Sequence, residues 1–315
     1  MRTCERRTLL VLATLLLACT SARGQTHPAP PLKVQIVLDK TEFFEGEPIF
    51  AMFELHNVSS DTVRIPRFAL SAGWLAGVLR RADGSVVPDR GWLDDYVCPR
   101  TSCNEDDVAP GRARYSPFVV QEFWGEEGPL SQPARYNDLK TGDYALAGSF
   151  ELDGPPGSTR VVASPVVFRI RPRRPAEDTT YQQFVRLRTI DAPKWRVAEL
   201  DSAVAWMSRR LAADRADPFA LKMLMWSDAQ SWAAGMPMDS TAAVRMFRLK
   251  LLVADARARS PIGALAVVYL YAAGPLRYGD PRLPLCSTLS GTPAGEIACE
   301  REAWFASERK ARRPH

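Results

Sequence analysis

Hydrophobic and polar positions alternate with a period of two through the first half of the chain. Leu32, Val34, Ile36 and Leu38 are separated by polar or charged residues, and similar alternation covers 49–55 and 144–152. This pattern predicts strands with one buried face and one solvent face. Shorter strands are expected at 62–65, 78–81, 85–87, 112–120 and 166–170. Since no helical pattern intervenes, we expect an antiparallel β-sandwich domain over 32–172.

The hydrophobic spacing changes after the prolines of the stretch Arg171-Pro172-Arg173-Arg174-Pro175. From there, apolar residues recur every three or four positions, as in Val197-Leu200-Val204-Met207-Leu211. That spacing is typical of amphipathic helices. The sequence therefore predicts a linker at 173–178 and an all-α domain over 179–315.

Two helix starts share one pattern. Asp217-Pro218 and, 43 residues later, Ser260-Pro261 each pair a capping residue with proline at the first helical position. An amphipathic segment precedes each of them. Two stacked α-hairpins that resemble tetratricopeptide repeats, or an ordinary helical bundle, fit this pattern.

Two of the expected helices have distinct roles. Residues 261–273 carry no charge, so that helix is expected to be central and buried. A last helix is expected over 296–310, with Ile297, Trp304 and Phe305 facing inward and a basic tail after it.

The N-terminus has the features of an export signal. Arginines precede the apolar run 8–18, which is too short to cross a bilayer. Residues 1–24 are therefore expected to be a signal peptide and the proline-rich 25–31 a tether. Cleavage before Gln25 would release the chain, whereas the lipobox-like Leu16-Leu17-Ala18-Cys19 would place a lipid on Cys19. We expect a periplasmic, secreted or lipid-anchored protein with no transmembrane helix after processing.

Short motifs in the first half suggest a family. The run Gly46-Glu47-Pro48, then a strand and Asn57-x-Ser59, is similar to the opening of many bacterial secreted immunoglobulin-like domains. Pro110-Gly111 and Gly142-Asp143-Tyr144 are similar to the later part of that pattern, and Tyr144 resembles a tyrosine corner. The arrangement also resembles the intracellular proteinase inhibitor domain of bacteria. The resemblance implies an immunoglobulin-like sandwich over 32–172 and transfers no inhibitory residue.

The cysteines agree with an oxidising compartment. Four of the six lie beyond the signal and the lipobox: Cys98, Cys103, Cys286 and Cys299. Their spacing lacks the paired C-x2-C of zinc sites. We expect the local disulfides Cys98–Cys103 and Cys286–Cys299, because crossed pairs would bridge two separate domains.

Composition and residue inventory favour a protein without enzymatic activity. The chain has a formal net charge of +5 and three histidines, and it lacks the G-x-S-x-G, H-E-x-x-H and phosphate-binding glycine-loop motifs. A small positive charge does not indicate nucleic-acid binding. Of the three histidines, His56 is the only candidate for acid–base chemistry in a folded core, and strand parity places it beside Glu54 on a solvated face. We expect no catalytic residue, no metal and no cofactor.

The segment 89–107 is the most unusual in composition. Six carboxylates surround Trp92, Tyr96 and the first cysteine pair, and they could be solvated, hold calcium or contact a partner. Candidate binding residues are the aromatic ones in the sandwich loops: Trp92, Tyr96, Phe123, Trp124 and Tyr136. We expect a cell-envelope interaction module that binds another envelope protein. The alternative is a carbohydrate-binding protein that uses these aromatic loops.

Overall fold

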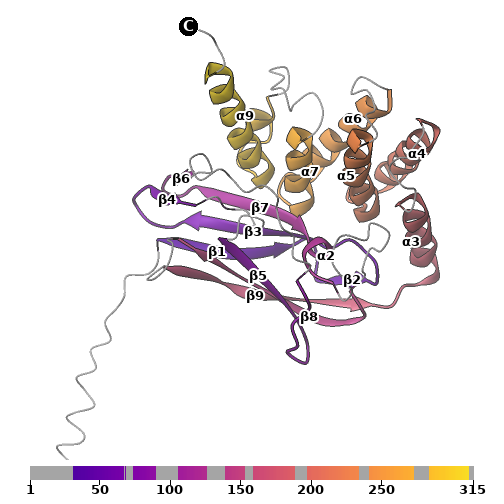
Figure 1. The fold of residues 1–315 in the computed structure, drawn as a ribbon, viewed down its shortest axis with the longest axis horizontal. Helices are drawn as coiled ribbons and strands as arrows, with labels where there is room; N and C mark the ends of the chain where they lie inside the picture. The colour runs from indigo at the N-terminus through magenta and orange to yellow at the C-terminus, as the bar shows by residue number, and fades with distance from the viewer. Residues whose placement is uncertain are drawn as a thin grey trace, which may run out of the picture. The chain divides into compact units, whose positions relative to one another are not determined.

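The structure is a computed structural model that describes residues 31–66, 68, 74–89, 106–125, 139–152, 159–188, 197–233, 241–272 and 284–311. Leu32–His315 forms one compact unit. Strands make up its N-terminal part and helices its C-terminal part, as the change in hydrophobic period predicts (Figure 1).

The strands within the described residues form three sheets. The first is antiparallel, in the order β1 (Leu32–Leu38), β3 (Phe50–Asn57), β7 (Ala113–Val119). The second has the order β2 (Glu42–Phe44), β9 (Arg160–Arg171), β8 (Gly142–Glu151), β5 (Leu75–Arg81). A short pair joins β4 (Val63–Ile65) to β6 (Asp106–Val108).

The two larger sheets enclose one hydrophobic core. The alternating apolar residues of β1 and β3, such as Val34 and Phe53, face Leu146 and Phe150 of β8. Their period of two places every second side chain in this core. Gly148 lies against the Phe53 ring, where an added Cβ would be 2.1 Å from a ring carbon. Glycine is therefore required for the two sheets to approach each other here.

Pairing and burial differ from the sequence prediction at two places. The pairing of β2 with β9 is parallel, because the chain crosses from the first sheet to the second between β1 and β2. The strand β3 is buried on both faces rather than on one. Its second face, with Phe50 and Met52, belongs to the hydrophobic core of the helices.

Among the described helices, the short α2 follows β7, and the others come after β9 in the chain. Their bounds are α2 (Val120–Phe123), α3 (Pro175–Arg188), α4 (Val197–Ala213), α5 (Pro218–Ala233), α6 (Thr241–Ala256), α7 (Pro261–Ala272), α8 (Leu285–Thr288) and α9 (Pro293–Ala311). The helix α4 packs on α5 and α6, α6 packs on α7, and α9 packs on α7 and α8.

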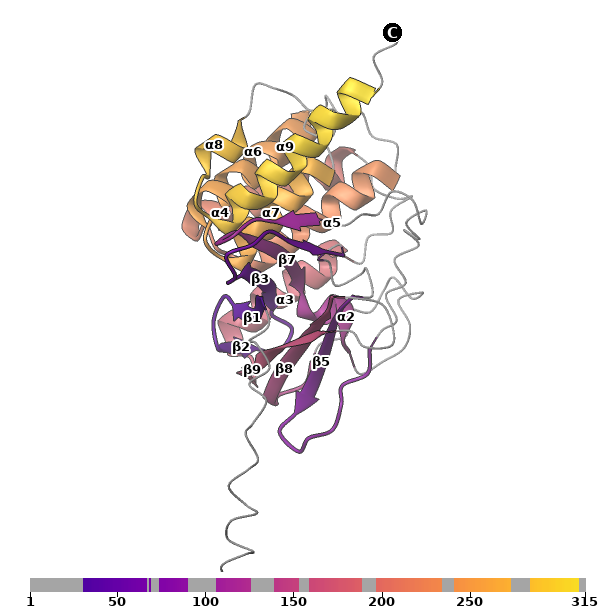
Figure 2. The ribbon, with the colours of Figure 1, turned by 90° about the vertical axis from the view of Figure 1, so that its left-hand side faces the viewer.

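The uncharged helix α7 is central, as its composition predicts. It packs on α5, α6 and α9 and also on the outer face of β3 and β7. The helix α9 packs on β7 as well, and both views show the helices on this side of the first sheet (Figures 1 and 2). Helices therefore cover the sheet face that the sequence alone predicts to be solvated.

The segment between strands and helices is tied to the second sheet. The strand β9 ends at Arg171, and α3 begins at Pro175, inside the predicted linker 173–178. Arg173 donates a hydrogen bond to the Glu45 carbonyl (2.9 Å), and its guanidinium lies over the Tyr181 ring (4.1 Å). A boundary between two separate domains at 173–178 stays a prediction.

One expectation for the last helix is wrong. Ile297 is buried and Phe305 packs against the helical core, but the Trp304 side chain is 53% exposed. The described buried residues of α9 lie within its first two turns, so the helix extends past the neighbours that would cover its C-terminal half. Among the described residues, every helix is too short or too polar to cross a membrane.

Candidate functional site

A shallow depression of about 390 Å³ opens at the turn between α4 and α5. It is lined by Arg209, Arg210, Ala213, Asp214 and Asp217. All five residues come from the end of α4 and the turn that starts α5. The depression is therefore polar and carries both signs of charge.

Two aspartates build this turn. The Asp214 carboxylate accepts a hydrogen bond from the Ala216 N–H (2.9 Å), and the Asp217 Oδ1 accepts one from the Ala220 N–H (2.7 Å). The second is the N-cap that Asp217-Pro218 predicts. Both bonds hold the backbone of the turn, so the charged side chains around it have a fixed frame.

Arg210 is fixed by its neighbours. Its Nε donates to Asp217 Oδ2 (2.7 Å), and its NH1 donates to Thr180 Oγ1 of α3 (3.2 Å). The guanidinium also lies 5.5 Å from the centre of the Trp206 ring. Since Arg210 and Asp217 neutralise each other, the exposed charges of the depression are Arg209 and Asp214.

Three turns meet beside the depression. Asp39, in the turn after β1, lies near Arg257 at the end of α6 and near Ser260, which lies between α6 and α7. Burial raises the Asp39 pKa above its ordinary value, and the charge of Arg257 opposes that rise. The charge of Asp214 also acts on Asp39. The turn after β1 therefore lies close to the α4–α5 and α6–α7 turns.

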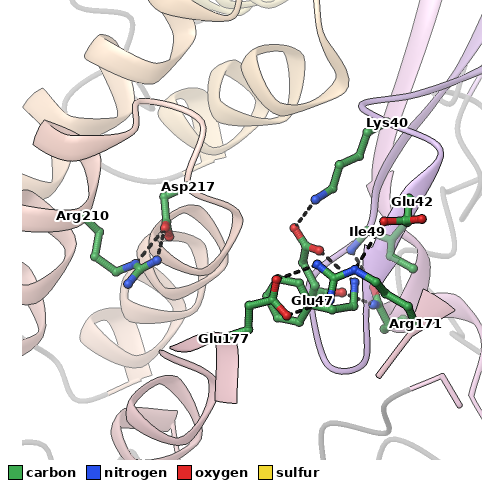
Figure 3. A network of polar contacts seen from close by, with 10 residues as sticks. Lys40, Glu42, Glu47, Ile49, Arg171, Glu177, Arg210 and Asp217 are labelled. Carbon is green, nitrogen blue, oxygen red and sulfur yellow. Dashed lines mark hydrogen bonds and ion pairs between the residues drawn. The ribbon is translucent and has the colours of Figure 1, made fainter. Parts of the chain in front are cut away.

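A separate polar network lies between the sheets and α3 (Figure 3). Lys40 Nζ donates to Glu47 Oε1 (2.7 Å), and the Phe44 N–H donates to Glu47 Oε2 (3.1 Å). Burial raises the pKa of Glu47 in spite of its lysine partner. Arg171 forms a two-bond ion pair with Glu177, which lowers the pKa of Glu177 to about 2. The network joins the end of β9 to the first turn of α3.

The Gln121 side chain hydrogen-bonds to the main chain just before β3, where a neighbouring strand would otherwise do so. Its Oε1 accepts a hydrogen bond from the Ile49 N–H (3.0 Å), and its Nε2 donates to the Glu47 carbonyl (2.6 Å). Its side chain is buried. One amide therefore satisfies two main-chain groups that lead into β3.

His56 lies in a polar group on the outer face of β3. Its Nε2 is 3.0 Å from Glu54 Oε2, which also accepts a hydrogen bond from Gln35. The neighbours match the strand parity read from the sequence, and the side chain remains 33% exposed. Among the described residues, no three potential metal ligands gather.

The predicted aromatic binding residues are described only in part. Trp92, Tyr96 and Tyr136 lie outside the described residues, as do Cys19, Cys98 and Cys103. Trp124 is 3% exposed and packs with Phe118 and Phe123 in the core between the sheets. Of the acidic segment, the structure describes Asp89 and the two aspartates at 106–107.

The second cysteine pair lies at disulfide distance. The Cα atoms of Cys286 and Cys299 are 4.5 Å apart, and the bond joins α8 to α9. Glu302 reinforces the joint, because its carboxylate accepts hydrogen bonds from the Cys286 N–H (3.0 Å) and the Tyr271 hydroxyl (2.9 Å). This local pairing is the one expected from the spacing of the two cysteines.

Sequence reasoning missed the charged turn as a surface. It used Asp217 as a helix cap and assigned no role to Arg209 or Arg210. The signal that was available is the run Arg209-Arg210-x3-Asp214-Arg215-x-Asp217, in which both signs alternate across a helix end. The contribution of Asp39 and Ser260 has no local signal, because these residues meet only through the tertiary fold.

Comparison with known proteins assigns this chain to no family. No family model and no curated protein matches the sequence. The solved structures that match include Spo0M, a sporulation control protein from Bacillus subtilis, with 13% identity, a TM-score of 0.25 and coverage of 50% of this chain. Another is native alpha-2-macroglobulin from Escherichia coli, from domain MG7 to the C-terminus, with 12% identity, a TM-score of 0.22 and 89% coverage. The chain spans 56% and 55% of the lengths of those structures, and scores this low carry no argument.

Proposed function

We propose that this chain is an exported, non-enzymatic cell-envelope protein that binds another envelope protein. In this proposal the contact surface is the charged depression of the α4–α5 turn together with the adjoining Asp39 and the α6–α7 turn. The observation that carries the proposal is the depression itself, in which exposed side chains of both charge signs lie at the α4–α5 turn, close enough to Asp39 for the charge of Asp214 to act on it.

The proposed architecture is an immunoglobulin-like sandwich followed by helical hairpins. Its first support is the order of the larger sheets, in which β2 adds to β9 while β1 adds to β3. A second is the Tyr144 hydroxyl, which donates to the Lys140 carbonyl (2.8 Å), as in a tyrosine corner. The hairpins are supported by the packing of α4 on α5, of α6 on α7, and of α4 on α6.

The chemistry of the depression fits a protein partner. Arginine is frequent at binding hot spots, and a rim of both charge signs selects a complementary surface. Arg210 is held by Asp217 and Thr180, so little conformational entropy is lost when it contacts a partner. Repeated α-hairpins commonly present such protein-binding surfaces.

Charge reversal tests the proposal. The double variant Arg209→Glu/Asp214→Asn reverses one exposed charge of the depression and removes the other, while the asparagine keeps an acceptor for the Ala216 N–H and the buried Asp217 cap is unchanged. We expect proteins captured by the wild-type chain from native envelopes, identified by mass spectrometry, to be lost with this variant. Arg245→Glu, at an exposed position of α6, is the matched control and should keep them. If both variants capture the same proteins, this surface is not the binding site.

The alternative function is carbohydrate binding by the aromatic loops. A glycan array with the purified chain distinguishes it from protein binding. Selective sugar binding that is lost in Trp92→Ala would favour the alternative. No sugar signal, together with partner capture that depends on Arg209 and Asp214, would favour the protein-binding proposal.

A further inference from the structure

The two helix turns beside Asp39 carry exposed arginines. Arg209 lies near the end of α4 and Arg215 just after it, while Arg257 and Arg259 follow the end of α6. All four residues are exposed, and none of their side chains forms an ion pair or a hydrogen bond with another described residue. A guanidinium group has five N–H donors. These arginines can therefore contact a partner without first breaking a contact among the described residues.

The ionisation of Asp39 indicates that the two turns lie close together. Burial raises the pKa of this carboxyl group, the charge of Arg257 lowers it, and the charge of Asp214, in the α4–α5 turn, raises it. Charge effects near a protein surface fade beyond roughly 8 Å at physiological salt. Both turns are therefore within reach of one side chain in the turn after β1, and their arginines belong to one surface.

Positive charge predominates on this surface. The exposed acids of the two turns are Asp214 and Asp255, and the Asp214 carboxylate already accepts a main-chain hydrogen bond of its own turn. The ion pair between Arg210 and Asp217 is neutral as a whole. Four exposed arginines therefore outnumber two exposed aspartates, and the surface is complementary to negative charge.

We propose that this surface binds an acidic peptide segment of the envelope partner, and that the arginines of both turns pair with its carboxylates. The inference rests on the proposed function and adds the chemistry of the partner. Arginine suits this role because its planar guanidinium donates two parallel hydrogen bonds to one carboxylate. Exposed arginines also stabilise the C-terminal ends of helices, so binding has to be measured apart from stability.

Fluorescence anisotropy of the full chain with a labelled deca-glutamate peptide tests the proposal. We expect binding that weakens as salt is raised, and no binding of deca-lysine at the same salt. Arg257→Gln/Arg259→Gln should weaken deca-glutamate binding about three- to tenfold, since one exposed ion pair contributes up to about fivefold. Arg257→Lys/Arg259→Lys keeps both charges and should bind more tightly than the glutamine variant. Asp214→Asn removes an acid but keeps the main-chain acceptor, so it should strengthen binding, by up to about threefold.

Arg245→Gln/Arg248→Gln is the matched control. Both arginines are exposed on α6, and their removal changes the net charge by the same amount. At 1.5 Å per residue they lie about 18 and 14 Å along the helix axis from Arg257. These distances exceed the range of screened charge, so deca-glutamate binding should stay within about 1.5-fold of the wild type.

Several results would overturn the proposal. They are no binding of deca-glutamate, equal losses in the control and in Arg257→Gln/Arg259→Gln, and a lower melting temperature of that variant with unchanged binding. Phosphatidylglycerol vesicles that bind in place of deca-glutamate, through the same arginines, would indicate a lipid surface instead. Deca-glutamate should also displace the captured envelope partner. Capture that depends on Arg209 and Asp214 but resists the peptide would refute the acidic segment and leave the proposed function standing.

Discussion

The ion pair between Arg171 and Glu177 gives a prediction with a definite dependence on pH. Arg171 ends β9, and Glu177 lies in the first turn of α3 (Figure 3). The guanidinium donates to both carboxylate oxygens, at 2.7 and 2.5 Å, and the Arg174 N–H donates to Oε2 at 2.7 Å. Glu177→Gln keeps an acceptor for the Arg174 N–H, as in a capping box, but removes the charge that Arg171 contacts.

The size of the effect follows from the shifted ionisation of Glu177. Arg171 lowers its pKa from 4.5 to about 2, mainly through the hydrogen bonds. Such a shift corresponds to at most about 3 kcal/mol of stabilisation. Solvent reaches about a fifth of each side chain and screens the pair, so we expect Glu177→Gln to lower the free energy of unfolding by about 1–2 kcal/mol near pH 7.

The sign of the pH dependence is fixed by the direction of the shift. A carboxyl group whose pKa is lower in the folded than in the unfolded state stabilises the fold fully above the unfolded value. That contribution is lost as the pH falls from about 4.5 toward 2. The difference in unfolding free energy between wild type and Glu177→Gln should therefore shrink steadily over this interval. Urea unfolding followed by circular dichroism, at several pH values from neutral downward, measures it.

Glu42→Gln is the matched control. Glu42 also contacts Arg171, but at 3.3 Å and with 61% of its side chain exposed, so we expect a loss below about 0.5 kcal/mol. Glu177→Ala should cost about 0.5–1 kcal/mol more than Glu177→Gln, because it also removes the bond to the Arg174 N–H. Equal losses from Glu177→Gln and Glu42→Gln, or a Glu177→Gln loss that does not change with pH, would refute the reasoning.

Three further changes have measurable outcomes. Gln121→Met leaves the Ile49 N–H and the Glu47 carbonyl without this partner and should lower the free energy of unfolding by about 2–5 kcal/mol. The same change at the exposed Gln182 should be nearly neutral. Equal effects of the two changes would contradict the role of the Gln121 amide. Gly46→Ala places a methyl group 2.3 Å from the Tyr181 ring at a φ of +82°, so the melting temperature should fall clearly. If adding Tyr181→Ala to this variant does not restore part of the melting temperature, backbone strain alone explains the fall. Cys286→Ser/Cys299→Ser opens a short loop and should cost about 3 kcal/mol in denaturant unfolding, and a melting curve that is unchanged by reductant in the wild type would argue against the disulfide.

The sequence by itself determined the order of elements. Alternation in β1 and β3 and the three-to-four spacing in α4 are local properties, and they located the change from strand to helix near Pro175. Asp217-Pro218 and Ser260-Pro261 located two helix starts, because caps act within a few residues. The uncharged composition of α7 likewise predicted its central position, since a helix without polar faces has to be buried.

Only the tertiary structure decided which elements cover the faces of the strands and helices. Strand alternation in β3 cannot show that α7 packs on its second face, because burial there depends on residues more than 200 positions away. The spacing of Trp304 in the sequence predicts a buried residue, but α9 extends past the elements that pack on it, so Trp304 is exposed. The charged surface at the α4–α5 turn has the same origin. Asp39 and Ser260 join it through the crossing of chain segments, a long-range contact that no periodicity within either segment records.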